Sequence, residues 1–117
     1  MTTVASTAFM PESITKLESD AMLVARLQGG DPDAYETLVR IHGGRLLSVA
    51  RRLLPNNEDA QDAVQEAFIK AFRAIGTFEE RAQLHTWLHR ILVNTALMKI
   101  RARKRRPEES IDDLLPT

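Results

Sequence analysis

Apolar residues recur along this chain at steps of three and four positions, the spacing of one face of an α-helix. Gly and Pro interrupt the pattern at a few points, and no stretch shows the apolar–polar alternation of a half-buried strand. The sequence therefore predicts an all-α fold, a compact bundle of about four helices joined by short connections. The expected helices begin near residues 21, 32, 58 and 84 and end near residues 28, 54, 75 and 104.

Residues that favour helix ends support these boundaries. Asp20 and Asp31 can each cap a helix with a carboxylate, and Pro32 is tolerated at a first helical position because its missing N–H has no partner there. The segment 55–57, Pro-Asn-Asn, ends the second helix and caps the third. Residues 43–44, Gly-Gly, interrupt the second helix, so either that helix bends or another helix packs close to it.

The polar ends of the chain lie outside the predicted bundle. Residues 1–17 are mostly small and polar with no sustained period, and we expect a flexible leader over residues 1–18. Pro107 ends the last helix, so the helical domain is expected to cover residues 19–107. Residues 110–113 have the character of a capping box and predict a further short turn.

Charge is distributed unevenly along the chain. The 117 residues carry 16 Lys and Arg against 16 Asp and Glu, a formal net charge of zero that argues against nucleic-acid binding. Counted by segment, residues 1–80 carry −4, residues 81–107 carry +8 without one acid, and residues 108–117 carry −4. The middle segment is therefore a strongly basic block.

Composition excludes several classes of function. The chain has no cysteine, which excludes disulfide scaffolds, thiol nucleophiles, iron–sulfur clusters and cysteine-bound zinc. No apolar run reaches the roughly 20 residues of a membrane-spanning helix. The N-terminus also lacks the basic start and long apolar stretch of a secretory signal. We expect a cytoplasmic protein that does not insert into a membrane.

Nothing in the sequence predicts an enzyme, a cofactor or a metal site. His85 and His89 share a helix face at the spacing of two zinc ligands. The residues between them include no Glu to act as a base, and His42 is the only further histidine. Two exposed histidines on a cationic helix are the preferred interpretation.

One face of the third helix is unlike an ordinary solvent surface. Opposite the apolar side, charged and amide side chains surround the apolar Ile69. This arrangement indicates a docking surface on which a partner buries the isoleucine and meets the acids with Arg or Lys. The alternative is a singly exposed isoleucine, which is common. The polar residues of this face are Asp62, Gln65, Glu66 and Arg73.

The last helix carries two apolar stripes. The first, expected to face the core, consists of Leu84, Trp87, Leu88, Ile91, Thr95 and Met98. The second, on the other side of the helix, consists of Val93, Leu97 and Ile100. Because the stripes lie on different sides, we expect the middle of the helix to be buried from two directions.

A polar edge separates the two stripes and is followed by a basic run. The edge consists of Arg90, Asn94 and Arg101, and the run adds Lys99, Arg103, Lys104, Arg105 and Arg106. Arg and Asn suit phosphates and base edges, so this helix predicts contact with a nucleic acid. The alternative is a solvated basic helix end favoured by the helix dipole, which accounts for two or three charges but not for eight.

Aromatic residues near the start of this helix are further candidates. Phe78 and Arg81 lie on a polar loop, where they can stack on a base or contact a phosphate, although a Phe tucked under its own helix is equally ordinary. The spacing of Trp87 places it on the core stripe, with part of its ring able to reach the loop.

Several runs of the sequence together resemble region 2 of bacterial RNA polymerase sigma factors of the extracytoplasmic-function (ECF) group. The runs are NNEDAQDAVQEAFIKAF, the following TF, and LHTWLHRILVNTALMKIRARKRR, preceded by DPDAYETLVRIHGGRLLSVARRLL. The resemblance covers about residues 20–107, nearly all of the expected helical domain.

The resemblance implies a role in transcription initiation. A domain of this kind docks on the clamp helices of the largest subunit of core RNA polymerase, and it recognises and helps to melt the promoter −10 element. The docking face described above would then meet the polymerase. The loop 77–83 would surround an unpaired base of the non-template strand, and the last helix would face promoter DNA.

The chain departs from the family pattern in two ways. The loop carries Glu79 and Glu80 where relatives often carry Arg, Gly and Ser, so no base preference is assigned. We expect this chain to lack the second, helix-turn-helix domain of the family, and we expect residues 108–117 to be the start of an interdomain linker. The resemblance also implies an anti-sigma factor as a partner. The alternatives are a stand-alone helical DNA-binding regulator, and a helical interaction protein that binds an acidic partner or RNA.

Overall fold

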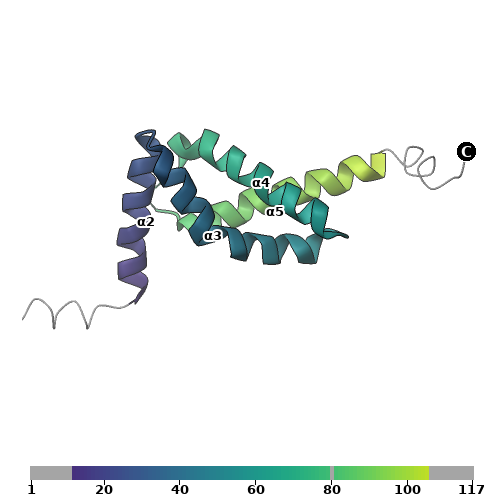
Figure 1. Ribbon diagram of the computed structural model, residues 1–117, viewed down its shortest axis with the longest axis horizontal. Helices are drawn as coiled ribbons and strands as arrows, with labels where there is room; N and C mark the ends of the chain where they lie inside the picture. Colours follow the sequence, from purple (N-terminus) through teal and green to yellow (C-terminus); the bar gives the residue numbers. More distant parts are fainter. Residues whose placement is uncertain (1–11, 80, 106–117) are drawn as a thin grey trace, which may run out of the picture.

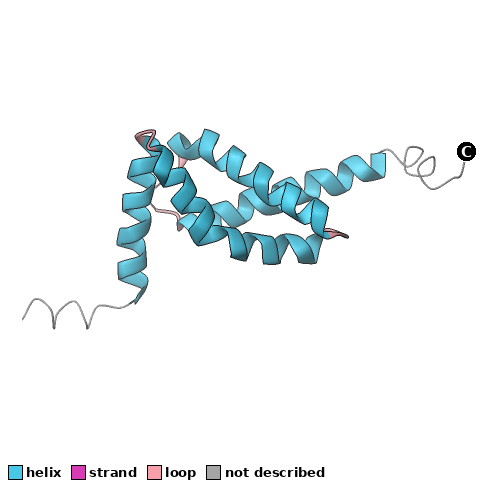
Figure 2. Cartoon of the chain, in the orientation of Figure 1, coloured by secondary structure: helices cyan, strands magenta, loops and turns pink. Residues whose placement is uncertain are grey.

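Four α-helices and one short 3-10 helix make up the regular structure of the part of the chain that the computed structural model describes, residues 12–79 and 81–105. They are α2 (Glu12–Gln28), α3 (Pro32–Leu53), α4 (Asn57–Ala74), η1 (Ile75–Thr77) and α5 (Leu84–Arg105) (Figure 2). The predicted all-α bundle of four helices is therefore confirmed. Of the leader expected over residues 1–18, residues 12–18 are instead helical, and residues 1–11 lie outside the described residues, as does the expected turn at residues 110–113.

The helices form an elongated bundle with one crossing element. Figure 1 shows α3, α4 and α5 side by side, and α2 standing across one end of this group. α4 packs against both α3 and α5, while α2 packs on α3 and η1. The last turns of α5 extend beyond the connection between α3 and α4 (Figure 1). This arrangement leaves the C-terminal part of α5 with few neighbours.

The start of the first helix differs from the prediction. We expected Asp20 to cap a short helix, whereas α2 begins at Glu12 and Asp20 lies inside it. Residues 12–20 contain no Gly or Pro, and Glu, Lys and Leu favour helix. The polar composition of this stretch concealed its helical propensity.

The cap of α3 is as predicted. The Asp31 carboxylate accepts a hydrogen bond of 3.0 Å from the backbone N–H of Asp33, and Pro32 occupies the first position of the helix. Arg26, in the last turn of α2, donates from Nε to Asp31 Oδ2 at 3.0 Å. The Arg26 hydrogen bond, together with the Asp33 N–H, lowers the pKa of Asp31. The same carboxylate thus joins the end of α2 to the start of α3.

The two glycines lie inside a continuous helix. α3 runs through Gly43 and Gly44 without a break and bends near its middle (Figure 1). A Cβ atom built on Gly43 would lie 3.9 Å from Val39 Cγ1 and 4.0 Å from Phe68 Cε2, which is ordinary contact. A Cβ atom on Gly44 would meet nothing within 4 Å. Close approach of α4 therefore does not require either glycine.

The core combines small residues on α4 with leucines on its neighbours. Ala60, Ala63, Ala67 and Ala71 form the buried side of α4 together with Phe68. Small side chains let α4 lie close to the helices on both sides. The largest fully buried side chains are Leu38, Leu84, Leu88, Leu92 and Thr95. Leu92, which we did not include in the stripe expected to face the core, is therefore part of the core. Met98, which we did include, is 55% exposed.

None of the described helices combines the length and the apolar composition needed to cross a membrane.

Candidate functional site

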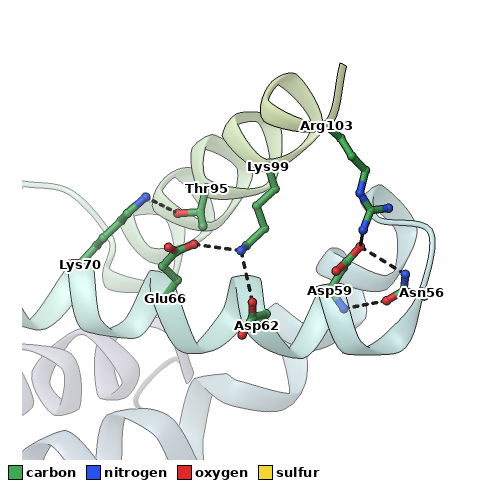
Figure 3. Close-up of polar contacts among 8 residues, drawn as sticks. All are labelled: Asn56, Asp59, Asp62, Glu66, Lys70, Thr95, Lys99 and Arg103. Atoms are coloured by element: carbon green, nitrogen blue, oxygen red, sulfur yellow. Dashed lines mark hydrogen bonds and ion pairs between the residues drawn. The ribbon is translucent and has the colours of Figure 1, made fainter. Parts of the chain in front are cut away.

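A row of polar contacts joins α4 to the C-terminal half of α5 (Figure 3). Lys99 on α5 is central to it, because its Nζ lies 3.4 Å from Glu66 Oε2 and 3.5 Å from Asp62 Oδ2 on α4. Burial lowers the pKa of Lys99, but the hydrogen bond to Glu66 and the charges of Glu66 and Asp62 outweigh it and raise that pKa overall. We refer to the contacts of Figure 3 as the α4–α5 ladder.

The ladder continues to the start of α4. Asn56 caps this helix by accepting a hydrogen bond of 2.8 Å from the backbone N–H of Asp59, as the sequence predicted. The Asn56 amide also donates to Asp59 Oδ2 at 3.2 Å, and Arg103 of α5 donates to the same oxygen at 2.6 Å. The helix cap is thereby joined to the C-terminal turns of α5 (Figure 3).

A lysine that sequence analysis missed lies at the other end of the ladder. Lys70 Nζ donates to the hydroxyl of the buried Thr95 at 3.2 Å, and that hydroxyl donates to the Ile91 carbonyl at 2.8 Å. Lys70 Nζ also lies 3.9 Å from Met98 Sδ. Met98, which we expected in the core stripe, thus lies beside this lysine at the edge of the α4–α5 interface.

The ladder divides the predicted basic residues of α5 into two groups. Lys99 and Arg103 face the acids of α4, at distances of 3.5 Å or less. The remaining basic and amide residues of α5 that we singled out lie on its exposed surface: Arg90, Asn94, Arg101, Lys104 and Arg105. Arg106 lies outside the described residues. The exposed group retains the strong positive charge that suits a polyanion.

The loop before α5 is organised by an aromatic pair. The rings of Phe78 and Trp87 meet edge to face with centroids 5.2 Å apart, and both side chains are half-buried. The Phe78 ring is thus packed on the start of α5. Arg81 is exposed, and its guanidinium lies 2.9 Å from the Glu79 carboxylate. That pairing partly neutralises the Glu79 carboxylate, a group that repels phosphates.

A pocket of about 310 Å³ lies beside this loop. Its lining comes from α2 and the loop: Asp20, Ala21, Val24, Ala25, Gln28, Phe78 and Ala82. Gln28 ties the two parts together by donating to the Ile75 carbonyl at 3.1 Å. Sequence analysis missed the contribution of α2, because residues 20–28 and the loop lie far apart in the sequence.

One part of the predicted docking face of α4 is exposed, and the other part forms ion pairs with α5. Ile69 is 43% exposed, and Gln65 and Arg73 are also exposed. Asp62 and Glu66, in contrast, form ion pairs with Lys99. Phe72, which we did not single out, is 41% exposed and packs edge to face on Tyr35 at 5.2 Å. The part of this face that remains exposed is therefore more apolar than the sequence indicated, because it gains Phe72 while two of its acids pair with Lys99.

A groove between α3 and α4 borders this face. Its volume is about 500 Å³, and its lining combines apolar residues with acids and amides at the rim. The lining residues are Tyr35, Val39, Gly43, Leu47, Glu58, Gln61, Asp62, Val64, Gln65 and Phe68. Within the described residues, no group of three or more His, Asp or Glu side chains is placed to hold a metal ion.

The fold and the distribution of charge define a sigma-factor domain. Residues 38–106 match the sequence profile of the Sigma-70 region 2 family, more than half of the chain, and the protein belongs to that family. Its relatives include sigma factors of the ECF group. It is 44% identical over 93 residues to the RNA polymerase sigma-H factor of Pseudomonas aeruginosa, over 80% of this chain and 48% of the relative. It is 42% identical over 106 residues to the ECF RNA polymerase sigma-E factor of Escherichia coli, over 91% of this chain and 53% of the relative.

A solved structure shares the fold. An engineered region 2 of sigmaE, determined by NMR in complex with GTAAAA, superimposes with a TM-score of 0.69 at 41% identity. The similarity covers 83% of this chain and 97% of that chain. The chain spans about half the length of the two sigma factors that it matches.

Proposed function

We propose that this protein acts as the region 2 domain of an ECF sigma factor, docking on core RNA polymerase and binding the non-template strand of the promoter −10 element. The observation that carries the proposal is the exposed basic edge of α5 on a fold that matches sigma region 2. The relative bound to GTAAAA supports recognition of a short nucleic-acid sequence by this fold. In the cell, such a domain acts in the cytoplasm without enzymatic chemistry.

The exposed part of the α4 face is the proposed polymerase-binding surface. Ile69 and Phe72 supply apolar area, and Gln65 supplies a hydrogen-bonding amide beside the groove. A helical partner with basic residues, such as the clamp helices of the largest subunit, complements the acids at the groove rim. An anti-sigma factor is the proposed second partner for these surfaces.

The exposed edge of α5 is the proposed DNA-binding surface. Arg90, Arg101 and Lys104 can neutralise phosphates, while Asn94 can hydrogen-bond a base edge. The loop at residues 77–83 and its neighbouring pocket are the proposed place for an unpaired base. Promoter melting follows when the protein binds the open strand more tightly than the duplex.

Binding to core polymerase tests the docking surface. In a pull-down with core polymerase or with an isolated clamp-helix fragment, we expect Ile69→Glu and Gln65→Ala to reduce retention of the protein. Ile41→Glu is the matched control, because Ile41 is an exposed isoleucine on α3, with 59% of its surface accessible. Retention unchanged in both α4 variants contradicts the docking assignment.

Binding to oligonucleotides tests the DNA surface. We expect single-stranded non-template DNA to bind more tightly than duplex, and Asn94→Ala and Arg101→Ala to weaken this binding. Added salt should weaken it as well, since phosphate contacts release counterions. Arg45→Ala, which removes an exposed arginine of α3, is the control. Equal affinity for a random duplex favours a general DNA-binding protein instead.

A further inference from the structure

An apolar side chain lies in the middle of the exposed polar stripe of α5. Counting by helical steps, Arg90, Asn94, Leu97, Arg101 and Lys104 follow one another at intervals of four, three, four and three residues, so they line one side of the helix. All five are exposed. At 1.5 Å per residue the stripe is about 21 Å long, with Leu97 at its midpoint.

Leu97 is more exposed than Val93 and Ile100, the other two residues of its apolar stripe. Ile100 packs against the core, and Val93 is half-buried, whereas Leu97 is 37% exposed. More than a third of the surface of Leu97 therefore remains open to a ligand. The flanking charges limit what can cover it, because Arg90, Arg101 and Lys104 form a basic surface on both sides. A polyanion is the complementary occupant.

Deoxyribonucleic acid presents one apolar substituent at a base edge, the 5-methyl group of thymine, and apolar side chains contact it in known complexes. We infer that Leu97 contacts a thymine methyl group of the bound strand, between phosphates held by the arginines and the lysine of the stripe. Leu97 is then a residue that determines sequence preference. This inference rests on the proposed function of the same surface.

Replacing thymine by deoxyuridine removes only the methyl group and therefore isolates this contact. The probes are twelve-nucleotide single strands of adenine with one thymine placed at successive positions, each paired with the same strand carrying deoxyuridine. Burying one methyl group is worth a factor of about four in affinity. We expect deoxyuridine to weaken binding about fourfold at one position, and Leu97→Ala to bring this ratio close to one.

Met98→Ala is the matched control. Met98 is the neighbouring exposed apolar residue, but its sulfur lies beside Lys70, away from the stripe. Its removal should leave the thymine-to-deoxyuridine ratio unchanged. Thermal unfolding of both variants checks that each remains folded.

The outcomes separate this inference from the proposed function. Strands that bind with no thymine-to-deoxyuridine difference at any position overturn the role of Leu97 and leave the DNA-binding proposal intact. A Leu97→Ala variant that binds all strands more weakly by the same factor also overturns the thymine contact and leaves the DNA-binding proposal intact, because the leucine then contacts a sugar or a base face. Absence of binding to every strand overturns both.

Discussion

Removal of the Lys99 charge is the most direct test of the α4–α5 ladder. Lys99→Met keeps most of the aliphatic stem and deletes both ion pairs, with Glu66 at 3.4 Å and Asp62 at 3.5 Å. Exposed ion pairs contribute about 0.2–1 kcal/mol each, so the loss of two pairs should cost about 1 kcal/mol. For a domain of this size, that cost lowers the thermal midpoint by about 4–8 °C.

Arg101→Met is the matched control, since Arg101 lies two residues further along the same helix, on its exposed side. Both variants lose one cation near the C-terminus of α5, so the dipole contribution is similar and only the ion pairs differ. A double-mutant cycle with Glu66→Gln measures the coupling between the two residues. Equal thermal midpoints for the two Met variants, or a coupling energy of zero, would refute the ladder as a stabilising feature.

The pH dependence adds a second readout. The pKa of Lys99 is raised above its ordinary value of 10.5, because the carboxylates outweigh the opposing effect of burial. A raised folded-state pKa means that this contribution to stability is fully present below pH 10.5 and is lost as the pH rises through the folded-state pKa. The difference in stability between the wild type and Lys99→Met should therefore be constant near neutrality and shrink only in strong base. High salt should also reduce it.

Three further predictions concern the fold. Leu88→Ala, at a side chain that is 1% exposed, should lower the free energy of unfolding by about 2–5 kcal/mol in a urea titration. Gly43→Ala should raise that free energy by about 0.5–1 kcal/mol, because the added Cβ makes only ordinary contacts inside α3; a loss of stability would show that the bend requires glycine. Asp31→Asn should be less stable than the wild type at neutral pH. Because the pKa of Asp31 is lowered, this difference should be present above pH 3.8 and vanish as the pH falls further, as acid titration of both proteins would show.

Sequence patterns predicted the helices well where local signals determine the structure. Helix spacing, the carboxylate of Asp31 and the amide of Asn56 are local features, and the last three helices begin within one residue of the expected positions. The start of α2 was missed because its first turns are polar, and polarity alone does not separate a helix from a loop. The position of Met98 beside Lys70 was not predicted, because the two residues lie 28 positions apart in the sequence.

The candidate site was harder to predict, because its polar residues contact each other across helices. A helical wheel assigns Asp62 and Glu66 to a polar face of α4 but does not show which neighbour that face meets. The ladder pairs residues 37 and 44 positions apart, so it depends on how α4 and α5 pack. Acidic and basic residues that lie in separate segments of the sequence therefore form one set of contacts, whereas Arg90, Asn94 and Arg101 are exposed, and their contact with DNA stays a prediction.

The ladder has a consequence for genetic studies of this domain. A charge-removing substitution at Glu66, chosen to impair polymerase binding, also leaves Lys99 with one acid fewer and increases the positive charge available to DNA. Under the proposed function, a single substitution at Glu66 would therefore weaken polymerase binding and strengthen DNA binding, two effects that oppose each other in a transcription assay. Second-site suppressors of defects in α5 should accordingly map to α4 codons 59, 62 and 66, in a segment that the proposed DNA surface does not include.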